Sequence, residues 1–399
     1  MVNFLPDMYY GLAFRKGGIH VEPKGGGGNP YLIITLDICF LKFKMRYTST
    51  MELLVALEYD RALRRERTFR DPLDLLHISD EHLLRHYRFP RQEIVRLCQK
   101  MEPLIGRLTR SSHAVPTHTQ ILVALRFFAN GSFLSDVEDA TGLSQSSVSK
   151  IIDNVTDALY RKSIIDINMP TSTSDIIKVK HGFRQIMDFP NIVGAIGGTR
   201  IPITAPTVDE SLNLNKKDAH SLKIQVVCDS QNYILDFVNK YPGSTQDSSI
   251  WNNCFLRSSF EEGDFGNSHL VGDSGYPLEP FLLTPFAQPS TPAEERYNRS
   301  LMMTRVVVEQ TIALLKSRFR CLHKCAGSLR YKPSKCCKIA AACMLLHNYC
   351  VKWRIPFNDI IKEEEEKDLN GPDEIPVPAG SGDAAGQAKR KEIVQNYFS

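Results

Sequence analysis

The chain has 399 residues, of which 42% are hydrophobic and 24% charged, and its formal net charge at pH 7 is +4. At roughly 150 residues per domain, this length predicts two or three domains, and the composition excludes collagen, coiled coils and wholesale disorder. The most apolar run, residues 31–43, contains Asp37 and Lys42, so it lacks the roughly 18 uncharged residues of a transmembrane helix and we expect no membrane partner.

The first residues carry no basic region followed by a long apolar core, as a secretory signal would. The ten cysteines are scattered apart from the adjacent pair Cys336 and Cys337. This arrangement favours a reducing compartment, the nucleus or the cytoplasm, and free thiols rather than disulfides.

Charge is distributed unevenly along the chain. Residues 61–110 hold twelve Lys and Arg against seven acids, and residues 296–340 hold eleven against one. Basic blocks in foldable sequence are typical of a polyanion partner, since each neutralised phosphate releases counterions. An ordinary charged surface is the alternative. Residues 359–374 carry eight acids against two lysines and little apolar periodicity, which predicts a solvated tail over 356–399 with a short C-terminal helix.

Residues 1–50 contain a glycine run, Gly25 to Gly28, and no consistent period, so we expect an N-terminal extension with weak or no packing. Apolar residues then recur at spacings of three and four over 51–165, with prolines as breaks. This pattern predicts an all-helical module of short helices.

A helix-turn-helix is predicted inside this module. Thr141-Gly142-Leu143 forms the turn, and Ser144 can cap a second helix whose buried stripe begins at Val148. Gln145, Ser146 and Lys150 fall on the outer side of its first turn, where major-groove readers place their contacts. Plain helix packing or a protein-binding surface is the alternative, because acids line the preceding helix.

Residues 166–355 predict an α/β module. Short β-branched runs at 192–196, 201–203, 222–227 and 233–238 are bounded by Gly, Asn and Asp, and helical spacing returns over 300–319 and 334–353. Because short turns join the first strands, we expect them to pair antiparallel.

Two acids in this module suit divalent-metal chemistry. Asp273 follows an apolar strand and precedes a glycine turn, while Glu309 is the single acid of residues 296–340 and lies within a predicted helix. Two-metal phosphodiester cleavage needs carboxylates that converge from separate elements. Arg305, Lys316 and Arg320 share the face of Glu309, which predicts a phosphate-contacting stripe; a surface ion pair between Glu309 and Arg305 is the alternative.

Thirty-five residues separate Asp273 from Glu309, the interval between the last two acids of many transposases and integrases. Further short motifs occur in a fixed order along the chain: Tyr87-Arg88-Phe89-Pro90, Gly142-Leu143-Ser144-Gln145, Tyr241-Pro242-Gly243-Ser244, Gly272-Asp273-Ser274, Thr291-Pro292-Ala293-Glu294, Ser317-Arg318-Phe319-Arg320 and Leu346-His347-Asn348. In these motifs the chain resembles the Harbinger (PIF) transposase superfamily, and most closely its transposase-derived nucleases.

The resemblance implies an RNase H-like α/β fold with an Asp-Asp-Glu metal triad for Mg²⁺ or Mn²⁺, preceded by a helical region containing a helix-turn-helix. It also implies metal-dependent DNA cleavage, a nuclear location and a Myb-like DNA-binding protein as partner. Asp273 matches the second acid of the triad and Glu309 the third.

The position of the first acid carries Gly197. Because the first acid bridges both cations in a two-metal site, we expect cleavage to be strongly impaired. Asp229 and Asp247, near the ends of the next two strands, are candidate substitutes; each could equally be a turn or capping residue. A DNA- or protein-binding scaffold with degraded chemistry is the alternative function.

Two other kinds of site are less consistent with the sequence. Cys321, Cys325, Cys336, Cys337, His347 and Cys350 could supply zinc ligands, but their spacing lacks a two-residue knuckle, so buried thiols and a hydrogen-bonded core histidine are expected. A serine hydrolase is excluded because Gly272-Asp273-Ser274-Gly275 is no Gly-x-Ser-x-Gly elbow.

Overall fold

The computed structural model describes residues 10–15, 18–23, 78–106, 115–131, 143–205, 220–357 and 383–399. The chain divides into two compact units, Met1–Asp71 and Pro72–Ser399. In the first unit, strands β1 (Tyr10–Arg15) and β2 (Gly18–Pro23) pair antiparallel. This hairpin lies in the segment for which the sequence predicts weak or no packing, so local strand pairing does occur there.

The second unit opens with helices. They are α3 (Asp80–Tyr87), α4 (Arg91–Ile105), α5 (Thr117–Asn130), α7 (Gln145–Asp166) and α8 (Thr173–Met187). The predicted cap of the second helix of the helix-turn-helix is confirmed, because the Ser144 side chain accepts the Ser147 N–H at the start of α7. The predicted first helix of that motif, with Phe133, Val137 and Ala140 on one face, and Thr141 and Gly142 of the predicted turn lie outside the described residues.

A five-stranded mixed sheet follows the helices. Its strands are β3 (Ile192–Pro202), β4 (Ser221–Cys228), β5 (Ile234–Pro242), β6 (His269–Val271) and β7 (Leu282–Leu283), in the order β5-β4-β3-β6-β7. β3, β4 and β5 pair antiparallel as predicted, whereas β3, β6 and β7 run parallel. The two β-branched runs predicted at 192–196 and 201–203 form one continuous strand, β3. A helical region followed by this mixed sheet confirms the predicted RNase H-like fold class.

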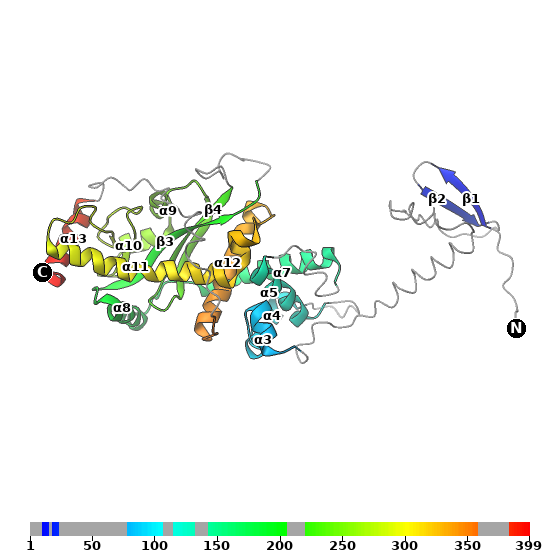
Figure 1. Cartoon of the computed structure of the whole chain (residues 1–399), viewed down its shortest axis with the longest axis horizontal. Coiled ribbons are helices and arrows are strands. Elements are labelled where there is room, and N and C mark those ends of the chain that lie inside the picture. The colour runs from blue at the N-terminus through cyan, green and yellow to red at the C-terminus, as the bar shows by residue number, and fades with distance from the viewer. Residues whose placement is uncertain are drawn as a thin grey trace. The chain divides into compact units, whose positions relative to one another are not determined.

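Helices cover both faces of the sheet (Figure 1). α8, α11 (Pro292–Arg318) and α13 (Ala384–Tyr397) share one buried cluster with β3, β6 and β7, and α12 (Pro333–Lys352) packs on β5. The short helices α9 (Asp247–Asn252) and α10 (Phe255–Glu261) belong to a second cluster, together with Ile196 and Val227 of the sheet. Since side chains alternate along a strand, neighbouring positions of β3 face these two different layers.

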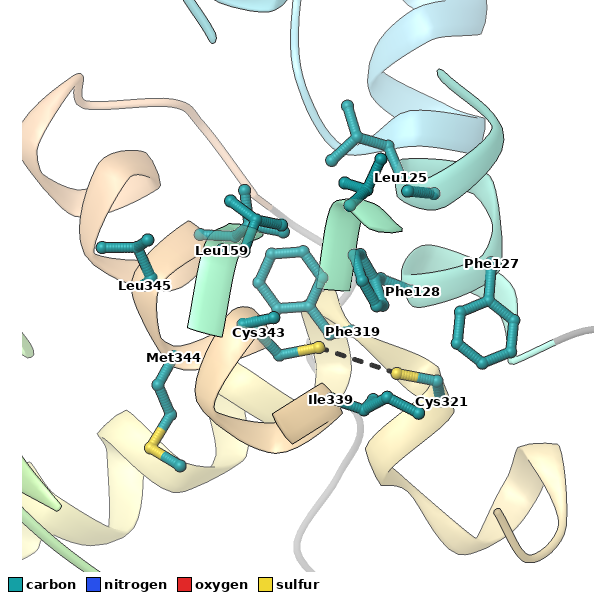
Figure 2. Close-up of a cluster of buried hydrophobic side chains, with 14 of the residues drawn as sticks. Leu125, Phe127, Phe128, Leu159, Phe319, Cys321, Ile339, Cys343, Met344 and Leu345 are labelled. Carbon is teal, nitrogen blue, oxygen red and sulfur yellow. Dashed lines mark hydrogen bonds between the residues drawn. The ribbon is translucent and has the colours of Figure 1, made fainter. Parts of the chain in front are cut away.

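One hydrophobic core crosses the predicted boundary at residue 165. It contains Leu125 and Phe128 of α5, Leu159 of α7 and Ile339 of α12, with strand residues such as Ile224. Figure 2 shows α5, α7 and α12 meeting around Phe319 at the end of α11. The helical region and the α/β region therefore share one core, because the two bury their apolar faces against each other.

The cysteine and histidine side chains of this core behave as predicted from their spacing. The nine cysteines in the described part of the chain are free, and the sulfurs of Cys321 and Cys343 lie 3.7 Å apart among apolar side chains (Figure 2). His347 is buried, and its Nε2–H donates to the Asn232 carbonyl at 2.8 Å. The neighbouring Asn348 side chain accepts the Ile234 N–H and donates to the Ile234 carbonyl, which ties α12 to the edge strand β5.

Within the described ranges, no helix combines the length and the apolar character that crossing a bilayer requires.

The shared core makes a prediction about cooperativity. Leu159→Ala removes a buried side chain of α7 and should lower the free energy of unfolding by about 2–5 kcal/mol. Because α7 packs on α12 and α12 on β5, we expect one transition, with the helices and the sheet losing structure together. Urea unfolding followed by circular dichroism and by tryptophan fluorescence measures this. Two separated transitions would show independent domains.

Acid should destabilise the protein partly through His347. Burial, reinforced by the charge of Arg318, lowers the pKa of His347 to about 4. Between pH 6.5 and 4 the unfolded chain therefore binds a proton that the folded chain does not. The stability present above pH 6.5 is thus lost as the pH falls. His347→Gln, whose amide can still donate to Asn232, should lose about 1–2 kcal/mol less than the parent between pH 7 and pH 5.

Urea titrations at the two pH values measure this difference. The pKa of His269, which burial also lowers to about 4, acts in both proteins and cancels from the comparison. Substitution of the exposed His181 on α8 by Gln is the matched control and should leave the pH dependence unchanged. Equal acid losses in the parent and in His347→Gln would contradict the prediction.

Candidate functional site

The register of β3 and β6 brings Gly197, in the middle of β3, near Asp273, which follows β6. The two strands run parallel, with Ala195 opposite Val271, and each of the two positions lies two residues further along its strand. Ala195 and Val271 both pack in the cluster that includes Val308 of α11. Because residues two apart on a strand share a face, Gly197 also looks toward α11.

Asp273 is oriented by the turn that follows β6. Its Oδ1 accepts the Gly275 N–H at 2.9 Å, and its backbone carbonyl accepts the Tyr276 N–H at 3.3 Å. The aspartate therefore folds the chain back while its second oxygen, Oδ2, points to α11. This geometry explains the pattern of an acid between two glycines, and it directs the second carboxylate oxygen toward Arg305.

Helix α11 carries the facing residues. Its start is set by a capping box: the Thr291 hydroxyl accepts the Glu294 N–H, and the Glu294 carboxylate accepts the Ser290 N–H at 2.6 Å. Pro292 fits the first turn, where no backbone N–H donor is needed. The motif Thr291-Pro292-Ala293-Glu294 is thus a helix start, and it fixes the register that brings Arg305 and Glu309 to the strand ends.

Arg305 joins the two predicted acids. Its Nη1 lies 3.6 Å from Asp273 Oδ2, and its Nη2 lies 2.6 Å from Glu309 Oε1. The structure thus brings Asp273 and Glu309 to the two sides of one guanidinium group. Their side chains remain 32% and 45% exposed, against 21% for Arg305, so solvent reaches both carboxylates. The ion pair considered as the alternative for Glu309 forms, and it extends to Asp273.

Val308 of α11 packs against the side of β3 on which a side chain at position 197 would lie. A Cβ atom at position 197 would lie 3.1 Å from Val308 Cγ1 and 3.3 Å from Val308 Cγ2. Gly197 is a strand residue without positive φ, so an L-residue fits its backbone. A side chain there requires Val308 to shift by a few tenths of an ångström, and it would face α11, the helix that carries Glu309.

The residues present do not fit a divalent-metal site. Hard cations such as Mg²⁺ need several oxygen ligands at close to 2 Å, and a two-metal site needs a carboxylate between the ions. Here the first position has no side chain, and a fixed positive charge holds the other two carboxylates. Among the described residues, no group of three or more His, Cys, Asp or Glu side chains is arranged to hold a metal ion.

The candidate substitutes for the first acid are engaged elsewhere. Asp229 forms the turn between β4 and β5, where its Oδ1 accepts the N–H groups of Gln231 and Tyr233. Asp247 begins α9 and pairs with Lys223 at 3.0 Å, both groups being buried. A Cβ at Gly198 would meet this pair, which places Asp247 on the opposite face of β3 from α11. Asp229 thus has the turn role that the sequence offered as its alternative, and Asp247 is held in a buried ion pair.

The predicted phosphate-contacting stripe on α11 is also wrong. Lys316 is 1% exposed, Arg320 follows the helix in a short 3₁₀ segment and is partly buried, and Arg305 is engaged with the carboxylates. The C-terminal half of α11 packs in the core beside α5 and α12. The basic composition of this segment does not indicate that burial. On α7, by contrast, Gln145, Ser146 and Lys150 are exposed.

Sequence reasoning missed the part played by two side chains. The spacing of four between Arg305 and Glu309 signals an ion pair, but the contact of Arg305 with Asp273 depends on how α11 crosses the strand ends. Val308 looks like an ordinary core valine, and only its position opposite Gly197 makes it part of the site. The buried pair of Lys223 and Asp247 has no signal in the sequence.

Comparisons with known proteins point to one kind of protein. Residues 196–348 match the family model described as DDE superfamily endonuclease. The rat and human proteins named "Putative nuclease HARBI1" are 36% and 34% identical to the chain over 334 residues, which cover 82% of this chain and 94% of each relative. The Arabidopsis thaliana "Protein ALP1-like" is 27% identical over 269 residues, covering 63% of the chain and 64% of that protein. No solved structure matches the chain.

Removal of the guanidinium group should uncover the two carboxylates. Arg305→Gln keeps a polar, helix-compatible side chain but takes away the charge between Asp273 and Glu309. Because exposed ion pairs contribute about 0–1 kcal/mol, the variant should fold. We expect it to bind Mn²⁺ at least about threefold more tightly than the parent by calorimetric titration. Arg299→Gln, at an exposed arginine of the same helix, is the control and should leave Mn²⁺ binding unchanged. An unaltered Mn²⁺ affinity in Arg305→Gln would count against the blocking effect of the guanidinium.

Proposed function

Because the chain belongs to the Harbinger transposase-derived nuclease family, whose DDE domain is that of an endonuclease superfamily, we propose that it is a DNA-binding member with impaired phosphodiester hydrolysis. In this proposal the fold and the DNA partner persist, while the chemistry of the carboxylate site has decayed. The chain then acts as a DNA- or protein-binding scaffold.

The observation that carries the proposal is the glycine at position 197. Gly197 lies next to Asp273 and faces the helix that bears Glu309, so it occupies the place where a third carboxylate would complete the set. An acid is missing at the position that a two-metal mechanism uses to bridge its ions. Without it, two neighbouring divalent cations would lack the negative charge that offsets their repulsion.

Arg305 supports the same proposal from the other side of the site. A guanidinium group that contacts both Asp273 and Glu309 supplies internally the positive charge that these carboxylates attract. Both carboxylates are thus engaged by Arg305, and among the described residues no group of three or more His, Cys, Asp or Glu side chains is arranged to hold a metal ion.

DNA remains the partner that best fits the charge of the chain. The block at residues 296–340 has a large excess of basic residues, although part of it is buried. Gln145, Ser146 and Lys150 are exposed on the first two turns of α7, behind a serine cap, which is where a helix presents side chains to a groove. A nuclear location and a Myb-like DNA-binding partner rest on the family resemblance and form part of the proposal.

Restoring the missing carboxylate provides the test. Supercoiled plasmid is incubated with purified parent protein and with Gly197→Asp, in Mg²⁺ or Mn²⁺. We expect the parent to nick no faster than Asp273→Asn. We expect Gly197→Asp to nick at least about tenfold faster than the parent, since even the residues that only orient metal ligands typically change activity by about 10–100-fold. Val308→Ala is combined with Gly197→Asp to give the new side chain room.

Gly197→Asn is the matched control, because it has the shape of aspartate without its charge and should stay inactive. Thermal unfolding of each variant separates a folded, inactive protein from one that has lost its structure. Metal-dependent nicking by the parent that Asp273→Asn abolishes would falsify the proposal. A folded Gly197→Asp/Val308→Ala protein that stays inactive would show that the glycine at position 197 does not by itself account for the impairment.

A further inference from the structure

A basic pocket lies between α4 and α12, and it shares no residue with the carboxylate site. It has a volume of about 550 Å³ and is lined by Arg96, Gln99, Lys100, Lys352 and Trp353. Three of these side chains are cationic and one is an amide that can donate hydrogen bonds. The two helices come from distant parts of the sequence, so the pocket exists only because the helical region and the C-terminal part of the fold share a core.

An aromatic floor organises the cations of this pocket. Tyr349 and Trp353 of α12 stack with ring centroids 4.9 Å apart and planes inclined by 12°. Arg96 lies over the Trp353 ring at 5.3 Å and Lys100 over the Tyr349 ring at 5.8 Å. Cation–π contacts of this kind hold long side chains in place without neutralising their charge.

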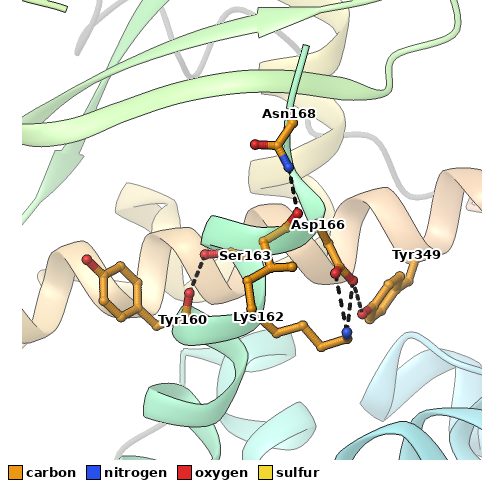
Figure 3. Close-up of polar contacts among 7 residues, drawn as sticks. Tyr160, Lys162, Ser163, Asp166, Asn168 and Tyr349 are labelled. Atoms are coloured by element: carbon orange, nitrogen blue, oxygen red, sulfur yellow. Dashed lines mark hydrogen bonds and ion pairs between the residues drawn. The ribbon is translucent and has the colours of Figure 1, made fainter. Parts of the chain in front are cut away.

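Residues at the end of α7 hold the Tyr349 ring of this aromatic floor in place. The Tyr349 hydroxyl donates to Asp166 Oδ2 at 3.0 Å, and Lys162 lies 3.1 Å from the same carboxylate oxygen (Figure 3). Phe89 packs edge-on against Trp353, with centroids 6.3 Å apart. The aromatic rings are therefore anchored before any ligand arrives, which reduces the entropy lost on binding.

The charge of the pocket stays positive after its neighbouring acids are counted. Glu93 pairs with Arg96 at 3.2 Å on the α4 surface, and Asp166 is already engaged by Lys162 and Tyr349. Lys100 and Lys352 are exposed at the rim. One acid against three cations leaves a net positive site with a guanidinium fork, an amide and two ammonium groups.

We propose that this pocket binds the sugar-phosphate backbone of DNA. A guanidinium and two ammonium groups from two helices suit the phosphates of a duplex, in which each strand carries one negative charge about every 3.4 Å along the axis. An acidic peptide fits less well, because peptides are also held through apolar anchors and the lining offers Trp353 as the single apolar residue. The inference rests on the proposed function in one respect, the choice of DNA as polyanion, and it adds a second contact surface to α7.

The test is a binding titration of the full chain with a fluorescein-labelled duplex of about 20 base pairs, followed by anisotropy at several NaCl concentrations. The pocket variant carries Arg96→Gln, Lys100→Gln and Lys352→Gln. We expect its affinity for DNA at about 0.1 M NaCl to fall at least tenfold. The slope of log K against log[NaCl] should become shallower by about two to three, since each lost phosphate contact removes about 0.9.

A control variant removes the same charge elsewhere on the described surface, through Arg299→Gln, Lys332→Gln and Lys391→Gln, all at exposed positions. It should change the affinity for DNA less than threefold, because its charges contribute to the overall electrostatic attraction of the surface and not to a specific binding site. Thermal unfolding confirms that both triple variants are folded. Equal losses in the two variants, or none in the pocket variant, overturn the proposal.

Competition identifies the occupant of the pocket. Polyglutamate is titrated against the parent and the pocket variant under the same conditions. If the pocket variant loses polyglutamate binding but keeps its DNA affinity, the pocket takes acidic peptides and the proposal fails. Failure here is distinguishable from failure of the proposed function: a parent that binds DNA while the pocket variant binds equally well sinks this inference alone, whereas a parent without DNA affinity sinks both.

Discussion

The guanidinium of Arg305 lies between two carboxylates that come from different parts of the chain, and the organisation of the site depends on that contact. Asp273 ends a buried strand and Glu309 lies on the long helix that crosses it, so their charges would repel each other if nothing intervened. Elsewhere in the DDE superfamily such a pair is completed by a third acid, and divalent cations balance the charge. In this chain Gly197 occupies the position of that additional acid, the first of the triad. Arg305, one helical turn from Glu309, balances the charge of the two carboxylates instead.

The fold does not depend on the chemistry that we propose is impaired. The contacts that position Asp273 and Glu309 are local and structural: an Asx turn onto Gly275 and a capping box at the start of α11. Neither depends on a bound metal ion. Loss of the first carboxylate leaves Val308 packed against a bare strand, which costs no buried polar group. The site can therefore lose a catalytic side chain without loss of the core behind it.

A second constraint is the continuous core beneath the helical region. α7 packs on α12, and α12 is tied to β5 through Asn348 and to the β4–β5 turn through His347. This packing makes the Leu346-His347-Asn348 motif a structural element that seals an exposed strand edge. The same arrangement brings α4 next to the end of α12 and so creates the basic pocket at Trp353. DNA contact, as proposed, would thus be distributed over surfaces that the shared core holds in fixed positions.

The local pattern of the sequence determined much of this protein. Strand and helix periodicity, the serine cap of α7, and the spacing and surroundings of Asp273 and Glu309 all follow from interactions between residues close in the chain, and the deficit at Gly197 is visible in the sequence itself. Tertiary structure alone decided the rest. Lys316 is buried and Asp247 lies on the opposite face of the sheet because helix crossing and strand register set these environments, and neither is encoded by a residue's neighbours in sequence. The contact between Arg305 and Asp273, and the meeting of Arg96 with Trp353, likewise depend on segments far apart in the chain, whose approach is fixed by the burial of their apolar faces.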